Sequence, residues 1–184
     1  NAKRGDVLVR DVDGHGQMND DDRLYCGRPV PEFTTSIKAK ITDKRSDALI
    51  GLPAALGNKI YNSTRQTLED VTKGTNFLKS TLDYWTPENP NAAHPRLVWD
   101  DPNRNTRAES DRYLEDGTYF RLRNIQIGYT FSPQLFNNML QKARVYINAE
   151  NLFTITGYSG YSPDVNASAN TYRGFDNFIY PASR

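Results

Sequence analysis

Two stretches of the chain alternate between apolar and polar residues, and this pattern narrows the folds that the chain can adopt. One stretch runs from residue 124 to 131 and the other from 144 to 155. Successive side chains of a strand point to opposite faces, so each stretch predicts a β-strand with one apolar and one polar face. Strands of a solvated sandwich and of a membrane barrel both show this pattern. The apolar positions are Ile125, Ile127, Tyr129, Phe131, Val145, Ile147, Ala149, Phe153 and Ile155.

Composition excludes several classes of protein. The 23 basic and 22 acidic residues leave a net charge of +1, so the chain has no footprint for nucleic acid. A single cysteine, Cys26, excludes an internal disulfide framework. No apolar run approaches the roughly 20 residues of a transmembrane helix. The first residues do not resemble a signal peptide and look like the interior of a longer sequence.

Four strands are predicted, at about 34–42, 48–61, 119–131 and 144–156. The second of these is apolar but contains Pro53, which has no N–H for a ladder hydrogen bond. Three short helices are also expected, at about 64–73, 76–85 and 132–142. The last would begin at Ser132 and Pro133, which suit the start of a helix.

The connections between the strands favour a membrane barrel. Residues 43–47 and 132–143 are short links, whereas residues 62–118 form one long connection. A compact soluble domain rarely holds so long a connection with so little regular structure. A membrane barrel has short turns on one side and long loops on the other. Because a barrel needs more than four strands, we expect this all-β chain to be part of a larger antiparallel transmembrane barrel.

Five segments, spread over nearly the whole chain, resemble the SusC/RagA family of TonB-dependent outer-membrane transporters and occur in the family's order. The resemblance implies the C-terminal segment of a large antiparallel β-barrel with long extracellular loops and short periplasmic turns. The segments are Gly5–Arg23 (with Asp11-Val-Asp-Gly-His-Gly16), Gly57–Asn62, Tyr84–Pro90, Ser110–Tyr129 and Arg144–Asp164.

The resemblance also implies a function and a location. We expect a multi-pass β-barrel in the bacterial outer membrane, in contact with its lipid, which imports oligomeric nutrients, glycan or peptide. The expected partners are a SusD-like surface lipoprotein and TonB, the latter acting through an N-terminal region absent from this sequence. No residue suggests covalent chemistry, so we expect no enzymatic activity.

Residues 11–22 have the spacing of a twelve-residue calcium loop, with Gly16 at its sharp turn. Calcium prefers oxygen ligands, and His15 stands where an oxygen side chain belongs. The loop is therefore either a weak calcium site or an Asp/Gly turn without a metal. The candidate ligands are Asp11, Asp13, His15, Gln17 (through its carbonyl), Asn19 and Asp22.

Aromatic residues in the loops and one strand carboxylate are candidates for substrate binding. The aromatic residues could stack on sugar rings or peptide side chains, or they could pack against neighbouring loops or a partner. The carboxylate could face the lumen, or it could make a structural hydrogen bond. The two histidines, His15 and His94, are expected to be solvated loop residues. The substrate candidates are Trp85, Trp99, Glu150, Tyr158 and Tyr161.

A different class of protein remains open, a soluble surface β-domain that binds glycan through its aromatic loops. Such a domain would stay monodisperse without detergent, whereas a barrel would not. In a barrel, seven apolar residues should face lipid: Ile125, Ile127, Tyr129, Val145, Ile147, Phe153 and Ile155. Asn124, Gln126, Asn148 and Glu150 should face the lumen.

Overall fold

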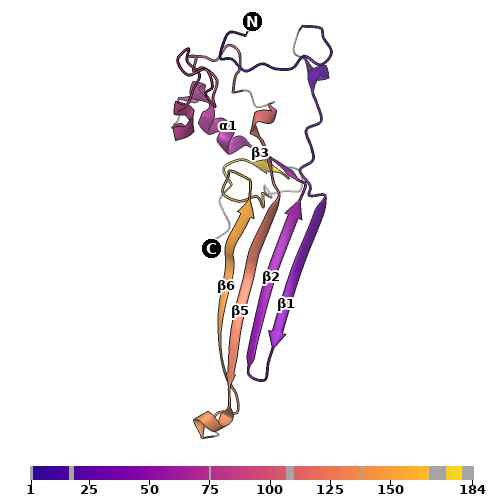
Figure 1. Cartoon of the computed structure of the whole chain (residues 1–184), viewed down its shortest axis with the longest axis vertical. Helices are drawn as coiled ribbons and strands as arrows, with labels where there is room; N and C mark the ends of the chain where they lie inside the picture. The colour runs from indigo at the N-terminus through magenta and orange to yellow at the C-terminus, as the bar shows by residue number, and fades with distance from the viewer. Residues whose placement is uncertain are drawn as a thin grey trace.

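A computed structural model describes residues 2–16, 19–74, 76–106, 110–137, 139–165 and 173–179. The chain forms a long four-stranded antiparallel sheet and a head of loops and short elements at one end of it (Figure 1). The strand order is β1–β2–β5–β6, and within the described residues this sheet is open rather than closed into a barrel. The strands are β1 (Phe33–Thr42), β2 (Ser46–Leu56), β5 (Tyr119–Phe131) and β6 (Ala143–Thr156).

The alternating stretches become the strands that they predict. β5 spans the same residues, 119–131, as the predicted strand, while β1 and β6 each begin one residue earlier than expected. A tight turn joins β1 to β2, where Asp43 and Ser46 exchange backbone hydrogen bonds of 2.8 and 3.1 Å.

The predicted strand at 48–61 is wrong in one respect, because it divides into two. β2 ends at Leu56, and β3 (Lys59–Asn62) joins a second sheet with the order β4–β3–β7. Between them Gly57 has a φ of 82°, in the left-handed region that favours glycine and ends a ladder. The other members are β4 (Leu114–Asp116) and β7 (Phe175–Asp176).

The predicted helices are shorter than expected. Asn62 caps α1 (Ser63–Glu69) by accepting a hydrogen bond from the Arg65 N–H, and a 3-10 turn, η2 (Val71–Lys73), follows up to the left-handed Gly74. The predicted helices at 76–85 and 132–142 are wrong. Their described residues contain only 3-10 turns, and in the second segment the left-handed Asn137 ends the turn. The 3-10 turns are η1 (Asp20–Asp22), η3 (Lys79–Leu82), η4 (Asp111–Tyr113) and η5 (Pro133–Phe136).

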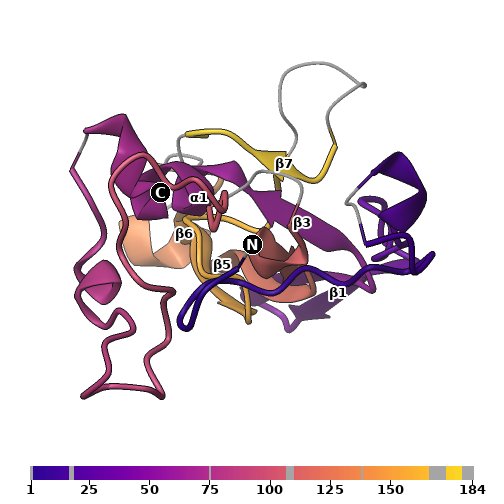
Figure 2. The ribbon, with the colours of Figure 1, turned by 90° about the horizontal axis from the view of Figure 1, so that it is seen from above.

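The buried hydrophobic cluster of the described chain lies in the head. Ile60, Tyr158 and Val165 form a buried cluster. Beside it, the ring of Tyr61 stacks on Phe175 with centroids 5.2 Å apart. Figure 2 looks down on this head, where the indigo N-terminal segment crosses above the strands. No helix among the described residues is long and apolar enough to cross a membrane.

Candidate functional site: a two-faced sheet below a polar head

The four-stranded sheet has one apolar and one polar face. β1 and β2 pair without a register shift from Phe33↔Leu56 to Thr42↔Asp47, so alternate residues of both strands share a face. Many side chains of the apolar face are exposed to solvent, up to 67% for Ile41 and 74% for Ile147. Its large side chains are Phe33, Ile37, Ile41, Ile50, Leu52, Leu56, Phe120, Leu122, Ile125, Ile127, Tyr129, Phe131, Val145, Ile147, Phe153 and Ile155.

A β-bulge keeps this apolar face continuous. Along β5 the apolar residues change from even positions to odd ones between Leu122 and Ile125. The register with β2 shifts at the same place, so that Ile50 pairs with Ile125 and Ala54 pairs with Phe120. Since β2 is regular, Ile50 and Ala54 share a face, and their partners must share it too. The bulge therefore absorbs the change of parity.

The polar face carries a row of hydrogen-bonded side chains. The Asn124 amide donates to Asn148 Oδ1 at 3.0 Å, and the Asn148 amide donates to Glu150 Oε1 at 3.3 Å. Glu150 is exposed on this face, and its strand partner is Asn124. These four strands thus present amides and a carboxylate on one side and hydrocarbon on the other.

Arg121 connects the polar face to the segment after β6. Its Nε donates to Thr154 Oγ1 at 3.0 Å, and its Nη1 lies 3.5 Å from the carboxylate of Asp164. The guanidinium also lies 5.1 Å from the centre of the Tyr119 ring. The positive charge of Arg121 therefore lies where the sheet meets the head.

The head contains a buried network of charges centred on Glu69, whose side chain is only 3% exposed. Arg65 Nε contacts Glu69 Oε1 at 2.7 Å, and Arg112 Nε lies 3.5 Å from Oε2. Glu115 accepts from Arg65 at 3.1 Å and from the Ser159 N–H at 2.8 Å. Burial opposes ionisation of Glu115, but these hydrogen bonds outweigh it and hold its pKa below the usual value.

His94 is a buried member of this network, so the prediction of a solvated loop histidine is wrong for it. Its residue is 6% exposed, and its Nδ1 lies 2.9 Å from Arg112 Nη2. Because a guanidinium only donates, Nδ1 must accept and the neutral ring carries its proton on Nε2. Burial lowers the pKa of His94, and the Arg112 cation lowers it further, against the opposing charge of Glu69. His15 is solvated as expected, with 75% of its side chain exposed.

The N-terminal segment is tied to the long connection by an ion pair. Arg96 Nε lies 2.5 Å from Asp6 Oδ1, and the Arg96 N–H donates to the Gly5 carbonyl at 2.8 Å. The hydrogen bond from Arg96 is the main reason that the pKa of Asp6 falls to about 2. Residues ninety positions apart in sequence are thereby held together.

The five predicted substrate residues do not share one environment. Trp99 is 92% and Tyr161 80% exposed. Trp85 is half-buried, and its indole packs on the backbone of Gly5. A side chain at position 5 would not fit, because its Cβ would lie 2.4 Å from the indole. Tyr158 is buried and its hydroxyl donates to Asp176 Oδ2 at 2.5 Å. Trp85 and Tyr158 therefore serve packing in the head, whereas Trp99, Tyr161 and the strand residue Glu150 present exposed surface.

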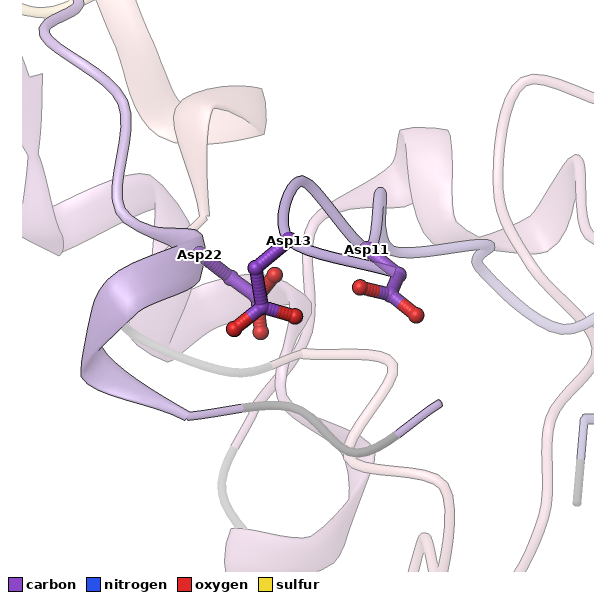
Figure 3. A group of neighbouring side chains, drawn as sticks. All are labelled: Asp11, Asp13 and Asp22. Atoms are coloured by element: carbon purple, nitrogen blue, oxygen red, sulfur yellow. The ribbon is translucent and has the colours of Figure 1, made fainter. Parts of the chain in front are cut away.

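Three of the predicted calcium ligands converge (Figure 3). The carboxylates of Asp11, Asp13 and Asp22 lie within 4.8 Å of one another. Asn19 caps η1 and donates weakly to Asp13, at 3.4 Å. His15 Nδ1 lies 2.9 Å from Asp13 Oδ1. Gln17 lies outside the described residues.

Backbone amides shape this loop. Asp11 accepts from the N–H groups of Gly14 and Gly16 at 2.6 and 2.7 Å, and Asp22 accepts from Val12 and Asn19 at 2.7 and 2.9 Å. The backbone bond from Asn19 is the largest cause that lowers the pKa of Asp22. Three hard oxygen donors at this spacing fit a calcium ion.

Sequence reasoning missed the charged network of the head. Arg65 and Glu69 stand four positions apart, the spacing of an ion pair on a helix, and this was the one local signal. No local pattern in the sequence predicts the ion pairs of Arg112 and Glu115, because their partners come from distant parts of the chain.

The chain is similar to curated TonB-dependent receptors over nearly its whole length. It is 32% identical to TonB-dependent receptor P3 of Formosa agariphila, over 98% of this chain and 18% of the receptor. It is 26% identical to TonB-dependent receptor SusC of Bacteroides thetaiotaomicron, over 94% of this chain and 17% of that protein. The chain thus spans less than a fifth of the length of these relatives.

Solved structures show the same architecture. The RagAB peptide importer in its "open-open" state matches with a TM-score of 0.67 and 25% identity, over 80% of this chain and 16% of that one. Another structure of the RagAB peptide transporter matches with a TM-score of 0.64 at 24% identity, over 81% of this chain and 18% of that one, and supports the fold alone. No protein-family model matches. Over the residues that it spans, the chain is therefore similar in sequence and in fold to TonB-dependent receptors of the SusC/RagA family.

Proposed function

We propose that these residues form part of the wall and the outer loops of a transporter that imports oligomeric nutrients across the bacterial outer membrane. The continuous apolar face opposite a polar face carries this proposal. A soluble protein rarely exposes so large an apolar surface. In a membrane barrel the apolar face contacts lipid and the polar face lines the lumen.

The dimensions of the strands support a barrel wall. β1 has 10 residues, β2 11, β5 13 and β6 14. About 9–11 residues suffice for a tilted strand to cross the hydrocarbon core. The open edges, β1 and β6, would pair with further strands of the complete barrel, as closure requires.

The head is proposed to face the outside, and the β1–β2 and β5–β6 turns the periplasm. This orientation follows the barrel rule of long outer loops and short inner turns. The exposed Trp99 and Tyr161 then offer aromatic surface to the substrate or to a SusD-like lipoprotein, and Glu150 faces the lumen. Because its named relatives are receptors and transporters, we propose gated passage powered through TonB as its role.

The substrate class is proposed as peptide or glycan oligomers. The relatives that match in structure are named peptide importers, and a relative that matches in sequence is SusC. Uptake of labelled oligopeptides and oligosaccharides by cells that carry the intact receptor would test the proposal. We expect uptake that is lost when TonB is deleted. Uptake independent of TonB would contradict it, as would a receptor that stays monodisperse without detergent, since that behaviour favours a soluble glycan-binding domain.

We also propose that the loop at residues 11–22 binds calcium, because three of its carboxylates converge within 4.8 Å. Asp11, Asp13 and Asp22 would hold the ion through their oxygens. Calcium would neutralise their mutual repulsion and stiffen this loop at the top of the head (Figure 1). The alternative is an Asp/Gly turn whose carboxylates serve only the backbone amides of the loop.

A further inference from the structure

The turn between β5 and β6 exposes three large apolar side chains at the end of the sheet away from the head (Figure 1). Leu135 is 67% exposed, Met139 86% and Leu140 48%. The neighbouring turn between β1 and β2 is polar, with the sequence Asp43-Lys-Arg-Ser46. Two turns at the same end of one sheet therefore differ in chemistry.

Aromatic contacts place the β5–β6 turn against the apolar face. Phe136 of η5 meets Phe131 edge-on, with ring centroids 6.1 Å apart. Phe131 in turn meets Tyr129 edge-on at 5.0 Å. Tyr129 and Phe131 belong to the apolar face, where they pair with Val145 and Ala143. The hydrocarbon surface of the sheet thus continues into the turn.

Local backbone hydrogen bonds join the described residues of the turn, while its apolar side chains stay exposed. Asn137 adopts a left-handed φ of 51°, and its N–H donates to the Gln134 carbonyl at 3.2 Å. The Met139 N–H donates to the Phe136 carbonyl at 2.9 Å. These bonds fold the segment into a compact unit that displays Leu135 and Met139.

Basic side chains flank this apolar turn in the neighbouring β1–β2 turn and just before β6. The Thr130 N–H donates to the Arg45 carbonyl at 2.7 Å, which fixes the β1–β2 turn beside the end of β5. Lys44, Arg45 and Lys142 are exposed there. Apolar side chains flanked by cations match the boundary between acyl chains and phosphate groups in a phospholipid leaflet.

We propose that residues 132–137 and 139–142 anchor the barrel in the phospholipid leaflet at this end, with Leu135, Met139 and Leu140 among the upper acyl chains. Lys44, Arg45 and Lys142 then contact the phosphate groups. This inference rests on the proposed function, because it requires lipid against the apolar face. Continuity with that face and the flanking cations favour lipid over a protein partner.

Fluorescence quenching in vesicles tests the anchor. Single cysteines would be placed in the intact receptor, in a background where Cys26 and any other cysteine are serine, and labelled with the environment-sensitive dye NBD. The vesicles would contain phosphatidylethanolamine and phosphatidylglycerol with bromine on the acyl chains. Met139→Cys probes the anchor, Lys44→Cys is the matched control in the polar turn, and Ile147→Cys reports lipid at the apolar face.

We expect brominated lipid to quench the label at positions 139 and 147 but not at 44, and aqueous iodide to quench it mainly at 44. Quenching at 147 with iodide quenching at 139 would place the turn in water and overturn the anchor alone. A label at 139 shielded from both quenchers would mean that protein covers the turn, and this also overturns it. Absence of lipid quenching at 147 would overturn the proposed function together with the anchor.

Discussion

Arg144 on β6 forms an ion pair with Asp47 on β2 across the intervening strand β5, although the residues are 97 positions apart in sequence. Nη2 lies 2.6 Å from Oδ2, and Nε lies 3.2 Å from Oδ1. Gly128 of β5 leaves the space for this contact, since an added Cβ would lie 2.6 Å from Arg144 Nη2 and 2.8 Å from Asp47 Oδ1. The ion pair therefore links β2 to β6 on the polar face and passes over Gly128 of β5.

Replacing Gly128 by alanine should displace the Arg144 guanidinium and break the two-point contact. We expect a loss of about 0.2–1 kcal/mol in the free energy of unfolding, the usual range for an ion pair that is partly exposed to solvent. Urea titration of the receptor in detergent would measure it. Gly51→Ala is the matched control, because its Cβ would meet its nearest neighbour at an ordinary 3.8 Å. Equal losses for both variants would argue against a role for the pair.

Arginine substitutions should separate the two faces of the sheet. Ile147→Arg should cost about 2–4 kcal/mol of folding free energy in vesicles if the site lies near the membrane midplane, and Asn148→Arg far less. The bulge in β5 allows a sharper test, because it places the even-numbered residues Leu122 and Gln126 on opposite faces of the sheet. Leu122→Arg should be costly and Gln126→Arg well tolerated, since only Leu122 lies on the apolar face. Equal sensitivity within either pair would contradict the barrel assignment.

Acidification should weaken the head through His94. Its pKa in the folded protein is lowered, so the unfolded chain binds the proton more readily. The stability is therefore complete above the ordinary histidine pKa of about 6.5 and declines as the pH falls below it. The groups that face the ring are Glu69, Arg112, Arg65 and Asp83.

Thermal unfolding of wild type and His94→Gln, measured above and below that pH, would check this expectation. The glutamine carbonyl can still accept from Arg112, but it does not titrate. We expect the variant to lose the decline near pH 6.5 and to keep the one caused by carboxylates near pH 4. An identical pH profile in the two proteins would show that His94 does not titrate on unfolding.

Cysteines placed at Asn89 and Lys44 should label from opposite sides of the membrane. Asn89 lies in the long connection of the head, and Lys44 lies in the β1–β2 turn at the far end of the sheet. In intact cells a membrane-impermeant maleimide should modify the cysteine at 89 and spare the one at 44 until the outer membrane is opened. Modification of both in intact cells would contradict the proposed orientation.

Exchanging His15 for aspartate should tighten calcium binding, because a charged oxygen would replace a nitrogen that calcium coordinates poorly. The wild-type site should be weak, with a Kd on the order of 10⁻⁴–10⁻³ M. Calorimetry would compare wild type, His15→Asp and Asp13→Asn, and the last should lose binding. Asp21→Asn is the control, since it removes the same charge from the loop but lies outside the convergent cluster. Absence of calcium heat in all four proteins would favour the plain turn.

Local pattern was enough to predict three of the long strands. β1, β5 and β6 follow from alternation because the two-residue period of a strand is written in neighbouring residues. The spacing of Asp11, Asp13 and Asp22 likewise anticipated that their carboxylates would meet, since a short loop brings its own residues together.

Tertiary structure decided the rest, through contacts between distant residues. The apolar run at 48–61 continues past Gly57, and only the pairing of β3 with β4 and β7 shows that the strand divides there. His94 has no neighbour in sequence that predicts burial, and its environment comes from Glu69 and Arg112. Phe120 lies on the apolar face of the sheet because of a bulge in the pairing of β5 with β2 and β6, which the sequence of β5 alone does not reveal. Alternation is a local property, whereas strand division, burial and register each depend on a partner that the chain brings from far away.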